Sequence, residues 1–526
     1  MENSFKGRSL CVIDDFSKEE RLYFFSLVRR LQEAVRTNDE AAVDSFRIKD
    51  PDFGIYEVFL EDSTRTKESF RNAANFHHVK LTEMNTEHSS FNKSESYADT
   101  FNTLCGYNNR IFVIRSKVEG VCRYLKEECT AYARRNGLPY VPAFINAGDG
   151  KHEHPTQELL DEYTFLQDNG WDTGSIHIAL VGDLYHGRTV HSKVNGLTLW
   201  KSVKVDLIAP EELAMPEHYV VQMRENGFDV RLFGSIEEYL AQADVAGKWY
   251  FTRPQLERMG EKILAKADRL RASITFRPEF MDRLPQDTRF YHPLPRHKVH
   301  PTIPTFLDDT PLNGWERQSI NGMFCRIVLL GLVAGKLGGD FVPTAAPEAA
   351  PEEEWIREII PDGAPKKEEV SEGVRPIRNG IVIDHICRGD QPEEIRRHMI
   401  LIRRVMNLDG LKGGEWVSQS SDGRFKGIIF RPGNFTLDHK QVKRLAAVAP
   451  GCTLNIIKDG RVAKKYRTSL PPRIYNFDDL MCLNEACISN DSQNENVQAM
   501  FLKTGDGRYR CAYCGKVHTF KEIFRH

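Results

Sequence analysis

The stretch Phe59-Leu-Glu-Asp-Ser-Thr-Arg-Thr-Lys-Glu-Ser-Phe70 joins the end of an apolar strand to a helix expected to begin near Thr66. The first turn of a helix carries amide N–H groups without intrahelical partners, and the positive end of the helix dipole lies there too. Hydroxyl and guanidinium groups at this position add donors for phosphate oxygens. These groups belong to Ser63, Thr64, Arg65 and Thr66. Taken alone, the stretch favours an ordinary N-cap, since Ser and Thr are the commonest capping residues.

Strand-like apolar runs alternate with helical stretches on both sides of this segment. After a helix expected over 17–37, such runs occur at 55–60, 79–84, 110–114 and 140–146. A helix over 155–170 precedes a second set of runs, at 176–181, 204–208, 228–233 and 245–251. This alternation predicts parallel sheets with helices on both faces. We therefore expect an α/β fold with two doubly wound lobes, whose ligands bind beyond the carboxyl ends of the strands.

The composition changes after a long amphipathic helix expected to begin at Trp315. Residues 338–375 are rich in Pro, Ala and Glu, which is typical of a flexible linker, with a short helix expected near Trp355–Ile360. Beyond the linker, four strand-like runs and two helices predict a small α+β domain. The strands are expected at 379–386, 426–431, 451–458 and 462–467, and the helices at 392–407 and 437–448.

Bulk composition excludes several classes of protein. The 526 residues exceed a single core, so about three or four domains are expected. The 72 basic and 74 acidic residues nearly balance, which argues against bulk attraction to nucleic acid or to a membrane. The apolar run 327–335 is too short to span a bilayer, and the N-terminus lacks the apolar core of a signal peptide. Most of the 11 cysteines are scattered, so we expect a cytoplasmic protein.

Four of the cysteines form two close pairs. Cys482 and Cys487 enclose four residues, Cys511 and Cys514 enclose two, and 23 residues separate the pairs. Four thiolates in two such knuckles suit a tetrahedral zinc ion, and a closed four-sulfur shell is structural rather than catalytic. The alternative, four unrelated cysteines, is improbable at this clustering. Zinc should therefore supply much of the folding free energy of a module with a sparse core.

Further polar motifs follow the first stretch in a definite order. They are Ser89-Ser-Phe-Asn-Lys93, Ile114-Arg115, His154-Pro-Thr-Gln157, Gly182-Asp-Leu-Tyr-His-Gly-Arg188, Thr252-Arg253-Pro-Gln255 and His292-Pro293-Leu294-Pro295-Arg296. Together, over about residues 5–335, they resemble aspartate carbamoyltransferase. Residues 376–526 resemble the regulatory chain of the same enzyme. The chain is therefore expected to join a catalytic and a regulatory polypeptide.

The resemblance implies the domain boundaries and the carbamoyltransferase fold. The two lobes, for carbamoyl phosphate and for aspartate, are expected at 1–153 and 154–314, and a helix over 315–337 returns to the first lobe. The linker then covers 338–375, an α+β domain similar to a nucleotide-effector domain covers 376–476, and the zinc domain covers 477–526.

The resemblance also implies a carbamoyl phosphate site. The residues Ser63 to Thr66 and Arg115 would hold the phosphate, and His154 would donate to the carbamoyl oxygen as negative charge develops. Gln157 would hold the carbamoyl nitrogen, and the backbone at Pro293 and Leu294 would complete the site. Since the departing phosphate can accept the amine proton, no protein base is required. The residues expected to act in catalysis are Arg65, Thr66, Lys93, Arg115 and His154.

The acceptor is expected to be aspartate. A dicarboxylate needs guanidinium partners, which Arg188 and Arg253 supply beside Gln255. An ornithine-transferring relative would typically carry His-Cys-Leu-Pro where this chain has His-Pro-Leu-Pro at 292–295. In the family, the loop with Ser89 and Lys93 reaches the site of a neighbouring subunit, so Ser89 joins the carbamoyl phosphate site and Lys93 the aspartate site. This arrangement implies catalytic trimers.

The regulatory resemblance implies nucleotide effectors such as ATP and CTP. The segment from Asn379 to Ile386 is similar to the effector strand of the family, although a plain edge strand is the alternative. The resemblance places effector contacts at Asp384, His385, Arg431, Asn455, Ile457 and Lys465. It also implies that the zinc domain binds the catalytic part, and that regulatory dimers bridge two catalytic trimers.

Two other functions stay open from the residues alone. Transfer to another amine acceptor, such as ornithine, is the nearest enzymatic alternative. A catalytically inactive scaffold or nucleotide-sensing protein is the alternative from another class. Six polar residues, retained together, argue against that second alternative: Arg65, Thr66, Arg115, His154, Arg188 and Arg253.

Overall fold

The computed structural model describes residues 3–85, 95–255, 266–344, 355–360, 377–389, 391–408, 410, 412–419, 423–434 and 439–524. The chain forms two compact units. The first runs to Ala345 and includes Asn484–Val497 and Tyr513–Gly515. The second consists of Ala346–Leu483, Gln498–Ala512 and Lys516–His526.

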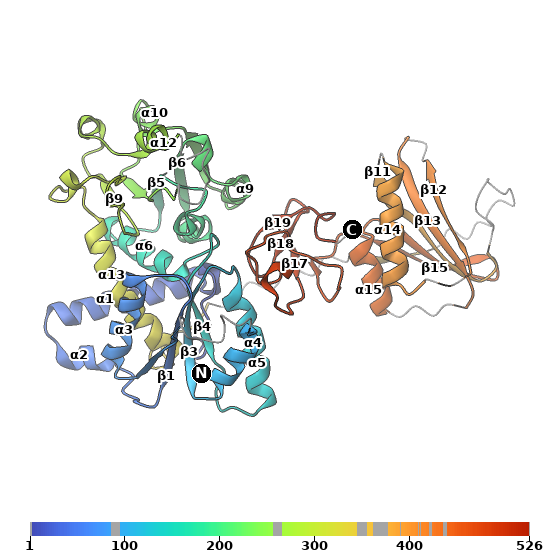
Figure 1. Cartoon of the computed structure of the whole chain (residues 1–526), viewed down its shortest axis with the longest axis horizontal. Helices are drawn as coiled ribbons and strands as arrows, with labels where there is room; N and C mark the ends of the chain where they lie inside the picture. Colours follow the sequence, from blue (N-terminus) through green and yellow to red (C-terminus); the bar gives the residue numbers. More distant parts are fainter. Residues whose placement is uncertain are drawn as a thin grey trace. The chain divides into compact units, whose positions relative to one another are not determined.

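The first lobe of the first unit is a four-stranded parallel sheet. Its strand order is β2 (Lys80–Glu83), β1 (Gly54–Phe59), β3 (Asn109–Ser116) and β4 (Ala143–Asp149). The helices α1 (Lys18–Arg36), α2 (Glu40–Ser45), α3 (Thr64–His77), α4 (Tyr97–Cys105) and α5 (Val121–Arg135) belong to the same lobe. Apolar residues of β3, such as Ile111 and Val113, are fully buried, as expected for a sheet covered on both faces (Figure 1).

The second lobe is a five-stranded parallel sheet. Its strand order is β7 (Asp229–Phe233), β6 (Ser202–Ile208), β5 (Ser175–Val181), β8 (Lys248–Phe251) and β9 (Arg289–Tyr291). Its helices are α6 (Pro155–Asp168), α7 (Arg188–His191), α8 (Lys193–Gly196), α9 (Glu217–Glu225), α10 (Ile236–Leu240) and α12 (Ala267–Ile274). The predicted pair of doubly wound lobes is thus confirmed, and β9 is a short strand that the sequence pattern did not indicate.

Two helices, α6 and α13 (Trp315–Val333), join the lobes into one unit. The helix α13 packs against α1 and α3 of the first lobe and against α6, so the helix predicted from Trp315 does return to the first lobe (Figure 1). One continuous apolar core includes residues of both sheets, for example Ile55 and Leu180. The relative placement of the two lobes is therefore set by packing, not by a single connection.

The second unit contains a six-stranded antiparallel sheet. Its strand order is β10 (Ile356–Ile359), β15 (Arg461–Thr468), β14 (Thr453–Lys458), β11 (Gly380–Gly389), β13 (Phe425–Pro432) and β12 (Gly414–Gln419). The helix α14 (Pro392–Val405) packs on β11 and β13, and α15 (His439–Val448) packs on α14. This confirms the predicted α+β domain.

The prediction of a short helix near Trp355–Ile360 is wrong. Residues Ile356–Ile359 form the strand β10, which pairs antiparallel with β15 from Ile356 opposite Thr468 to Ile359 opposite Lys465. The spacing of the apolar residues at both ends of this short segment fits a helix as well as a strand. The free edge of β15 decides between them, because it offers backbone hydrogen bonds to an extended segment.

The cysteine-rich segment forms a small antiparallel sheet. Its strands are β16 (Arg473–Ile474), β17 (Phe501–Lys503), β18 (Tyr509–Cys511) and β19 (Val517–His518), paired in that order. Such short strands bury few side chains, which agrees with the expected dependence on a metal.

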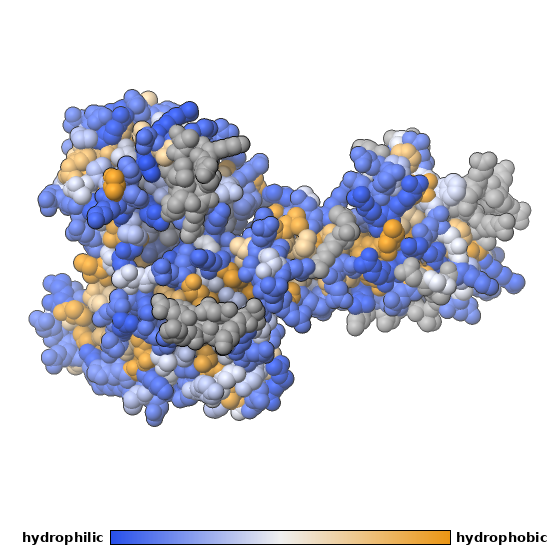
Figure 2. All heavy atoms as spheres, viewed as in Figure 1, coloured by the Kyte–Doolittle hydropathy of each residue, from blue (hydrophilic) through white to orange (hydrophobic). Residues whose placement is uncertain are grey.

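Figure 2 shows that the visible surface is mostly hydrophilic, with apolar residues interspersed. In the described part of the chain, no helix combines the length and apolar character needed to cross a membrane.

We expect Ser17→Ala to destabilise the first lobe by about 1 kcal/mol. Ser17 is the N-cap of α1, where its hydroxyl accepts from the Glu20 N–H at 3.2 Å while Glu20 bonds back to the Ser17 N–H at 2.7 Å. Urea denaturation measures the loss in the free energy of unfolding, and hydrogen exchange measures the loss of protection within α1. Ser26→Ala is the matched control, because this exposed serine of the same helix caps no terminus. Equal effects of the two substitutions would contradict the capping assignment.

Candidate functional site

Most of the predicted site residues line one cavity of about 870 Å³ in the first unit. The cavity lies at the carboxyl ends of strands from both lobes, as ligand sites of such sheets do. Ser89 and Lys93 fall outside the described residues. The predicted residues that the structure brings together are Ser63, Thr64, Arg65, Thr66, Arg115, His154, Gln157, Arg188, Arg253, Gln255, Pro293 and Leu294.

The stretch predicted to bind phosphate forms the start of α3. The helix begins at Thr64, two residues earlier than expected, with Ser63 as the N-cap residue in extended conformation. The Ser63 side chain makes no capping hydrogen bond, so it does not act as an ordinary cap. Arg65 lines the same cavity, and partial burial lowers the pKa of its guanidinium. The geometry therefore favours an anion site over the simple capping alternative.

One carboxylate bridges guanidinium groups from the two lobes. Oε2 of Glu61 lies 3.2 Å from Nη2 of Arg115 and 2.8 Å from Nη2 of Arg188. The side chains of all three are only 12–13% exposed. Glu61 stands beside the phosphate stretch in sequence, but the sequence analysis assigned it no role. It therefore neutralises two guanidinium groups that line the cavity.

Backbone carbonyls at the carboxyl end of β4 hold the same two guanidinium groups. Nη1 of Arg115 donates to the Ala147 carbonyl at 3.2 Å, and Nη1 of Arg188 donates to the Gly150 carbonyl at 3.1 Å. Between them Gly148 has φ +114°, and a Cβ atom there would stand 3.0–3.1 Å from both guanidinium groups. Only glycine lets the two cations approach this backbone so closely.

His154 is the N-cap residue of α6 and is almost completely buried. Burial and the charges of Arg115, Arg188 and Arg326 hold the pKa of this imidazole well below its usual value, so the ring is neutral near pH 7. Its Nδ1 lies 3.3 Å from Oγ1 of Thr156. When that hydroxyl donates to Nδ1, the ring proton resides on Nε2 and can be donated to a ligand oxygen.

The second-lobe side of the cavity is organised by Asp183. Its carboxylate accepts from the backbone N–H groups of His186 and Gln255, both at 2.9 Å. Burial opposes ionisation, but the hydrogen bonds from His186 and Gln255 outweigh it and lower the pKa of Asp183. Arg253 and Gln255 line the cavity next to this loop. Asp183 therefore shapes the loop that carries His186 and anchors the backbone at Gln255.

The His292 loop closes another side of the cavity. The imidazole Nδ1 of His292 accepts from the Leu294 N–H at 2.7 Å, and the His292 N–H donates to Oε1 of Gln318 at 2.9 Å. Burial and three nearby arginines lower the pKa of His292 to about 3, so its ring is neutral. These contacts fix the backbone at Pro293 and Leu294, which faces the cavity.

The sequence analysis missed several residues that line this cavity. Gln318 and Arg326 both come from α13, and Nη1 of Arg326 donates to Oγ of Ser69 at 2.9 Å in α3. No local motif marks them, because they approach the site only through the packing of α13 on α3 and α6. Glu61 differs from them, because it adjoins the stretch predicted to bind phosphate and so had a local signal.

The predicted effector contacts lie on neighbouring strands of the second unit. Asn455 on β14 pairs with Val382 on β11 and with Lys465 on β15. Asp384 forms an ion pair with Lys426 at 3.1 Å, a cation that the sequence analysis did not single out. His385 is about 40% exposed and Ile457 is buried.

Arg431 occupies a different kind of environment. Its side chain is 6% exposed, and Nη2 lies 2.8 Å from Oε1 of Glu415. Nη1 also donates to the carbonyls of Gly414 and Phe430, at 3.1 and 3.0 Å. The guanidinium thus stabilises the sheet edge, and ligand binding would require it to leave these partners.

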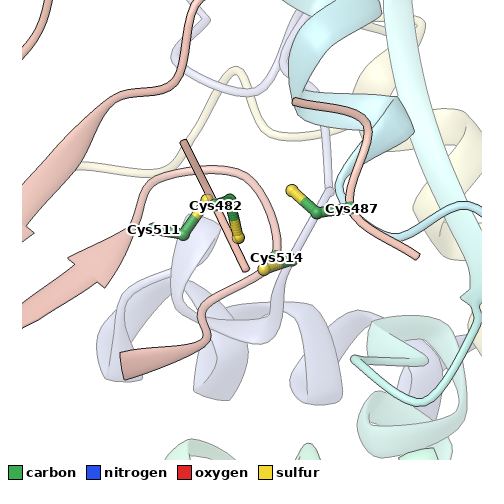
Figure 3. Close-up of side chains that lie close together, drawn as sticks. All are labelled: Cys482, Cys487, Cys511 and Cys514. Carbon is green, nitrogen blue, oxygen red and sulfur yellow. The ribbon is translucent and has the colours of Figure 1, made fainter. Parts of the chain in front are cut away.

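The four paired cysteines converge as predicted. The sulfur atoms of Cys482, Cys487, Cys511 and Cys514 all lie within 4.8 Å of one another, and all four residues are buried (Figure 3). A tetrahedral zinc–thiolate site has sulfurs about 3.8 Å apart, which follows from Zn–S bonds of about 2.3 Å. A small contraction around the ion satisfies that geometry. The donor set is therefore that of a closed structural zinc site.

Residues 484–488, around the second cysteine of the first pair, contact the first lobe within the first unit. The Glu119 N–H donates to the Ala486 carbonyl at 2.7 Å, and the Ile488 N–H donates back to the Glu119 carbonyl at 3.0 Å. Nδ2 of Asn484 donates to Oε2 of Glu119 at 2.6 Å. Burial raises the pKa of the Glu119 carboxyl. These bonds hold residues 484–488 against the residues that precede α5.

Comparison with protein families assigns four parts of the chain. Residues 8–167 match the carbamoyl-P binding domain of aspartate/ornithine carbamoyltransferases, and residues 174–333 match their Asp/Orn binding domain. Residues 372–469 match the allosteric domain of the aspartate carbamoyltransferase regulatory chain. Residues 472–524 match the metal binding domain of that regulatory chain.

Curated relatives cover the chain from end to end. Protein PyrBI of Treponema denticola is 66% identical over 531 residues, covering 100% of this chain and 99% of the relative. Protein PyrBI of Thermotoga maritima is 53% identical and covers all of both chains. The aspartate carbamoyltransferase catalytic subunit of Thermococcus kodakarensis is 35% identical over 63% of this chain and 99% of its own length.

Solved structures match the first unit. Aspartate transcarbamoylase from Trypanosoma cruzi in complex with carbamoyl aspartate and phosphate is 28% identical, with a TM-score of 0.53, over 63% of this chain and 97% of that one. The same enzyme in complex with N-(phosphonacetyl)-L-aspartic acid gives 29% identity and a TM-score of 0.53.

Gly148→Ala should weaken binding of anionic ligands in the cavity by roughly tenfold or more, because the added methyl group displaces Arg115 and Arg188. Titration with inorganic phosphate, followed by calorimetry, measures the change. Gly137→Ala is the matched control, since this glycine also has positive φ but has no atom within 4 Å of its added Cβ. Unchanged phosphate binding in the Gly148 variant would show that the two guanidinium groups do not depend on this backbone.

Cys514→Ser should abolish stoichiometric zinc binding and destabilise the cysteine-rich module, because the remaining three thiolates leave the shell open. Elemental analysis of the purified chain and thermal denaturation measure both effects. Cys387→Ser provides the control, since Cys387 lies outside the cluster. Full zinc content in the Cys514 variant would exclude the four-sulfur site.

Proposed function

This chain belongs to the aspartate carbamoyltransferase family, with catalytic and regulatory parts in one polypeptide, and we propose that the cavity between its lobes is the active site. The enzyme transfers the carbamoyl group of carbamoyl phosphate to the amine of L-aspartate, giving N-carbamoyl-L-aspartate and phosphate. The observation that carries the site assignment is the convergence of guanidinium groups from both lobes on one cavity.

Carbamoyl phosphate binds at the start of α3 in this proposal. The phosphate accepts from the first-turn N–H groups and the hydroxyls of Ser63, Thr64 and Thr66. Arg65 and Arg115 neutralise its charge, and the phosphate displaces Glu61 from Arg115. The uncapped start of α3 and the position of both cations at one cavity support this assignment.

The transfer step needs a donor for the developing oxyanion. The amine nitrogen of aspartate attacks the carbamoyl carbon, and the bond from that carbon to the phosphate oxygen breaks with the electron pair leaving on phosphate. His154, held neutral by burial, donates Nε2–H to the carbamoyl oxygen as negative charge develops. The amine proton passes to the departing phosphate. Bond formation and bond cleavage are thereby balanced without a protein base.

Aspartate binds on the side of the second lobe. Arg188 and Arg253 pair with its two carboxylates, and Gln255 adds a hydrogen bond. Pro293 and Leu294 present backbone carbonyls to the carbamoyl amine and to the attacking amine. Since Arg188 already pairs with Glu61, arrival of a substrate carboxylate exchanges one anion for another and brings the lobes together.

The assembly follows from the loop that carries Ser89 and Lys93. In this proposal the loop enters the site of a neighbouring subunit, Ser89 beside the phosphate and Lys93 beside both substrates. Catalysis then requires a trimer, and regulatory domains in pairs bridge two trimers. The protein acts in the cytoplasm, where its buried thiols stay reduced.

The α+β domain is an allosteric domain, and we assign ATP and CTP as its effectors. Asp384, His385, Asn455 and Lys465 face the nucleotide in this proposal, with Ile457 supplying its backbone. Lys426, which neutralises Asp384, lies where it can also meet a phosphate. Arg431 takes part only if it exchanges Glu415 for the ligand.

Arg253→Ala should raise the KM for aspartate by about a hundredfold, which corresponds to roughly 3 kcal/mol for a lost buried charge pair. The KM for carbamoyl phosphate should change little, because Arg65 and Arg115 remain. Steady-state kinetics with each substrate varied measures both. Arg224→Ala, an exposed arginine of α9, is the control. Equal loss for the two substrates would reject Arg253 as the aspartate ligand, and turnover of ornithine in place of aspartate would reject the acceptor itself.

A further inference from the structure

A cluster of charged side chains lies buried between the lobes, and the reaction as described does not use it. Lys193 on α8 places Nζ 2.8 Å from Oε2 of Glu158 and 2.8 Å from Oδ2 of Asp161, both on α6. On the same helix Glu162 pairs with Arg21 of α1 at 2.5 Å. All five side chains are at most 2% exposed. Burying so many charges is costly, so the arrangement calls for a reason beyond stability.

The other oxygen of Asp161 leads directly to the active site. Its Oδ1 accepts from Nε2 of Gln157 at 2.9 Å and from Nε2 of Gln318 at 2.6 Å. The opposite end of Gln318, Oε1, accepts from the His292 N–H at 2.9 Å. One carboxylate therefore joins the residue proposed to hold the carbamoyl nitrogen with the loop that closes the cavity.

An ionised carboxylate can only accept hydrogen bonds, and this fixes the orientation of both amides. Gln157 and Gln318 must each turn their NH₂ group to Asp161. For Gln318 the remaining oxygen meets a backbone N–H, which is consistent with that orientation. For Gln157 the oxygen is the end left for a ligand, and Gln157 lines the cavity.

We propose that Asp161 is a positioning residue that makes the site selective for a carbamoyl over an acetyl group, and that Lys193 holds it for this role. The carbamoyl NH₂ can donate to Oε1 of Gln157, whereas the methyl group of acetyl phosphate would leave that buried oxygen without a partner. The inference rests on the proposed contact between Gln157 and the carbamoyl nitrogen. It adds the reason why the amide oxygen of Gln157, and not its NH₂ group, faces the ligand.

Titratable groups from four elements lie around Asp161. They are Lys193 from α8, Glu158 on its own helix, Tyr250 from β8, and Cys325 and Arg326 from α13. Burial opposes the charge of Lys193, but Asp161 and Glu158 outweigh it and raise the pKa of the ammonium. Nζ of Lys193 also stands 4.0 Å from the ring centroid of Tyr250. The cation is thus held on the far side of Asp161 from Gln157.

Asp161→Asn tests the proposal with almost no change in volume. Because Lys193 can only donate, the new amide should turn its oxygen to the ammonium and its NH₂ to Gln157. Gln157 then flips and presents NH₂ to the carbamoyl NH₂, two donors facing each other. We expect the KM for carbamoyl phosphate to rise about tenfold or more, with the inhibition constant of acetyl phosphate within about twofold of its parent value.

Glu162→Gln is the matched control in the full-length enzyme. This carboxylate is the next residue of α6, equally buried and ion-paired, but its partner is Arg21 rather than Gln157. It should lower thermal stability while preserving the ratio of the KM for carbamoyl phosphate to the inhibition constant of acetyl phosphate. A parent enzyme that does not discriminate between the two phosphates would refute the proposed contact of Gln157 itself. A discriminating parent whose Asp161→Asn variant weakens both ligands equally, or neither, would overturn the role of Asp161 alone.

Lys193→Met supplies a second test with a distinct readout. A buried carboxylate without its cation takes up a proton as the pH falls, and a protonated carboxyl can donate to Gln157 as an amide does. The variant should lose discrimination between carbamoyl and acetyl phosphate at low pH and recover it at high pH. The parent ratio should not vary with pH in this way. A Lys193→Met ratio that is constant with pH and equal to that of the parent would exclude the role of Lys193, even if the variant is less stable.

Discussion

Repulsion among guanidinium groups is the constraint on which the active-site structure depends. Six arginines line one cavity, and like charges at such distances disfavour the compact state unless anions or carbonyls surround them. Glu61 and the carbonyls of Ala147 and Gly150 hold two of these cations without ligand. Substrate anions then exchange with Glu61 at little electrostatic cost. Burial, together with the charges of nearby arginines, holds the pKa of His154 well below its usual value, so its neutral ring can donate an N–H.

The two lobes meet this constraint because their strands end at the same cavity. Parallel strands place every carboxyl end at one edge, so loops distant in sequence, such as those of Arg115 and Arg253, converge. The helices α6 and α13 span the interface and carry side chains that reach the site from behind. Asp161 and Arg326 show the consequence, since both position active-site groups through contacts made by buried charges.

The regulatory part depends on a different interaction. A module with strands as short as β16 and β19 cannot bury enough apolar surface, and four thiolates around zinc replace the missing core. The knuckle that begins at Asn484 then presents backbone groups to Glu119 in complementary order. In the α+β domain, part of the fusion segment adds β10 to the sheet, which covers the edge of β15 that would otherwise remain unpaired.

The sequence by itself determined the parts of this protein that follow from local pattern. Alternating apolar runs predicted both parallel lobes, the pattern over 17–37 predicted α1, and two cysteine pairs predicted the zinc site. The polar motifs at strand ends resemble those of the carbamoyltransferase family. This resemblance identified the cavity residues, because each motif is contiguous in the sequence. Tertiary structure decided what no short segment encodes: the strand at Ile356–Ile359, the bridge through Glu61, and the approach of Gln318, Arg326 and Lys193. These depend on a free sheet edge or on helices packed across the lobes, and their partners lie on other elements, most of them far away in the chain.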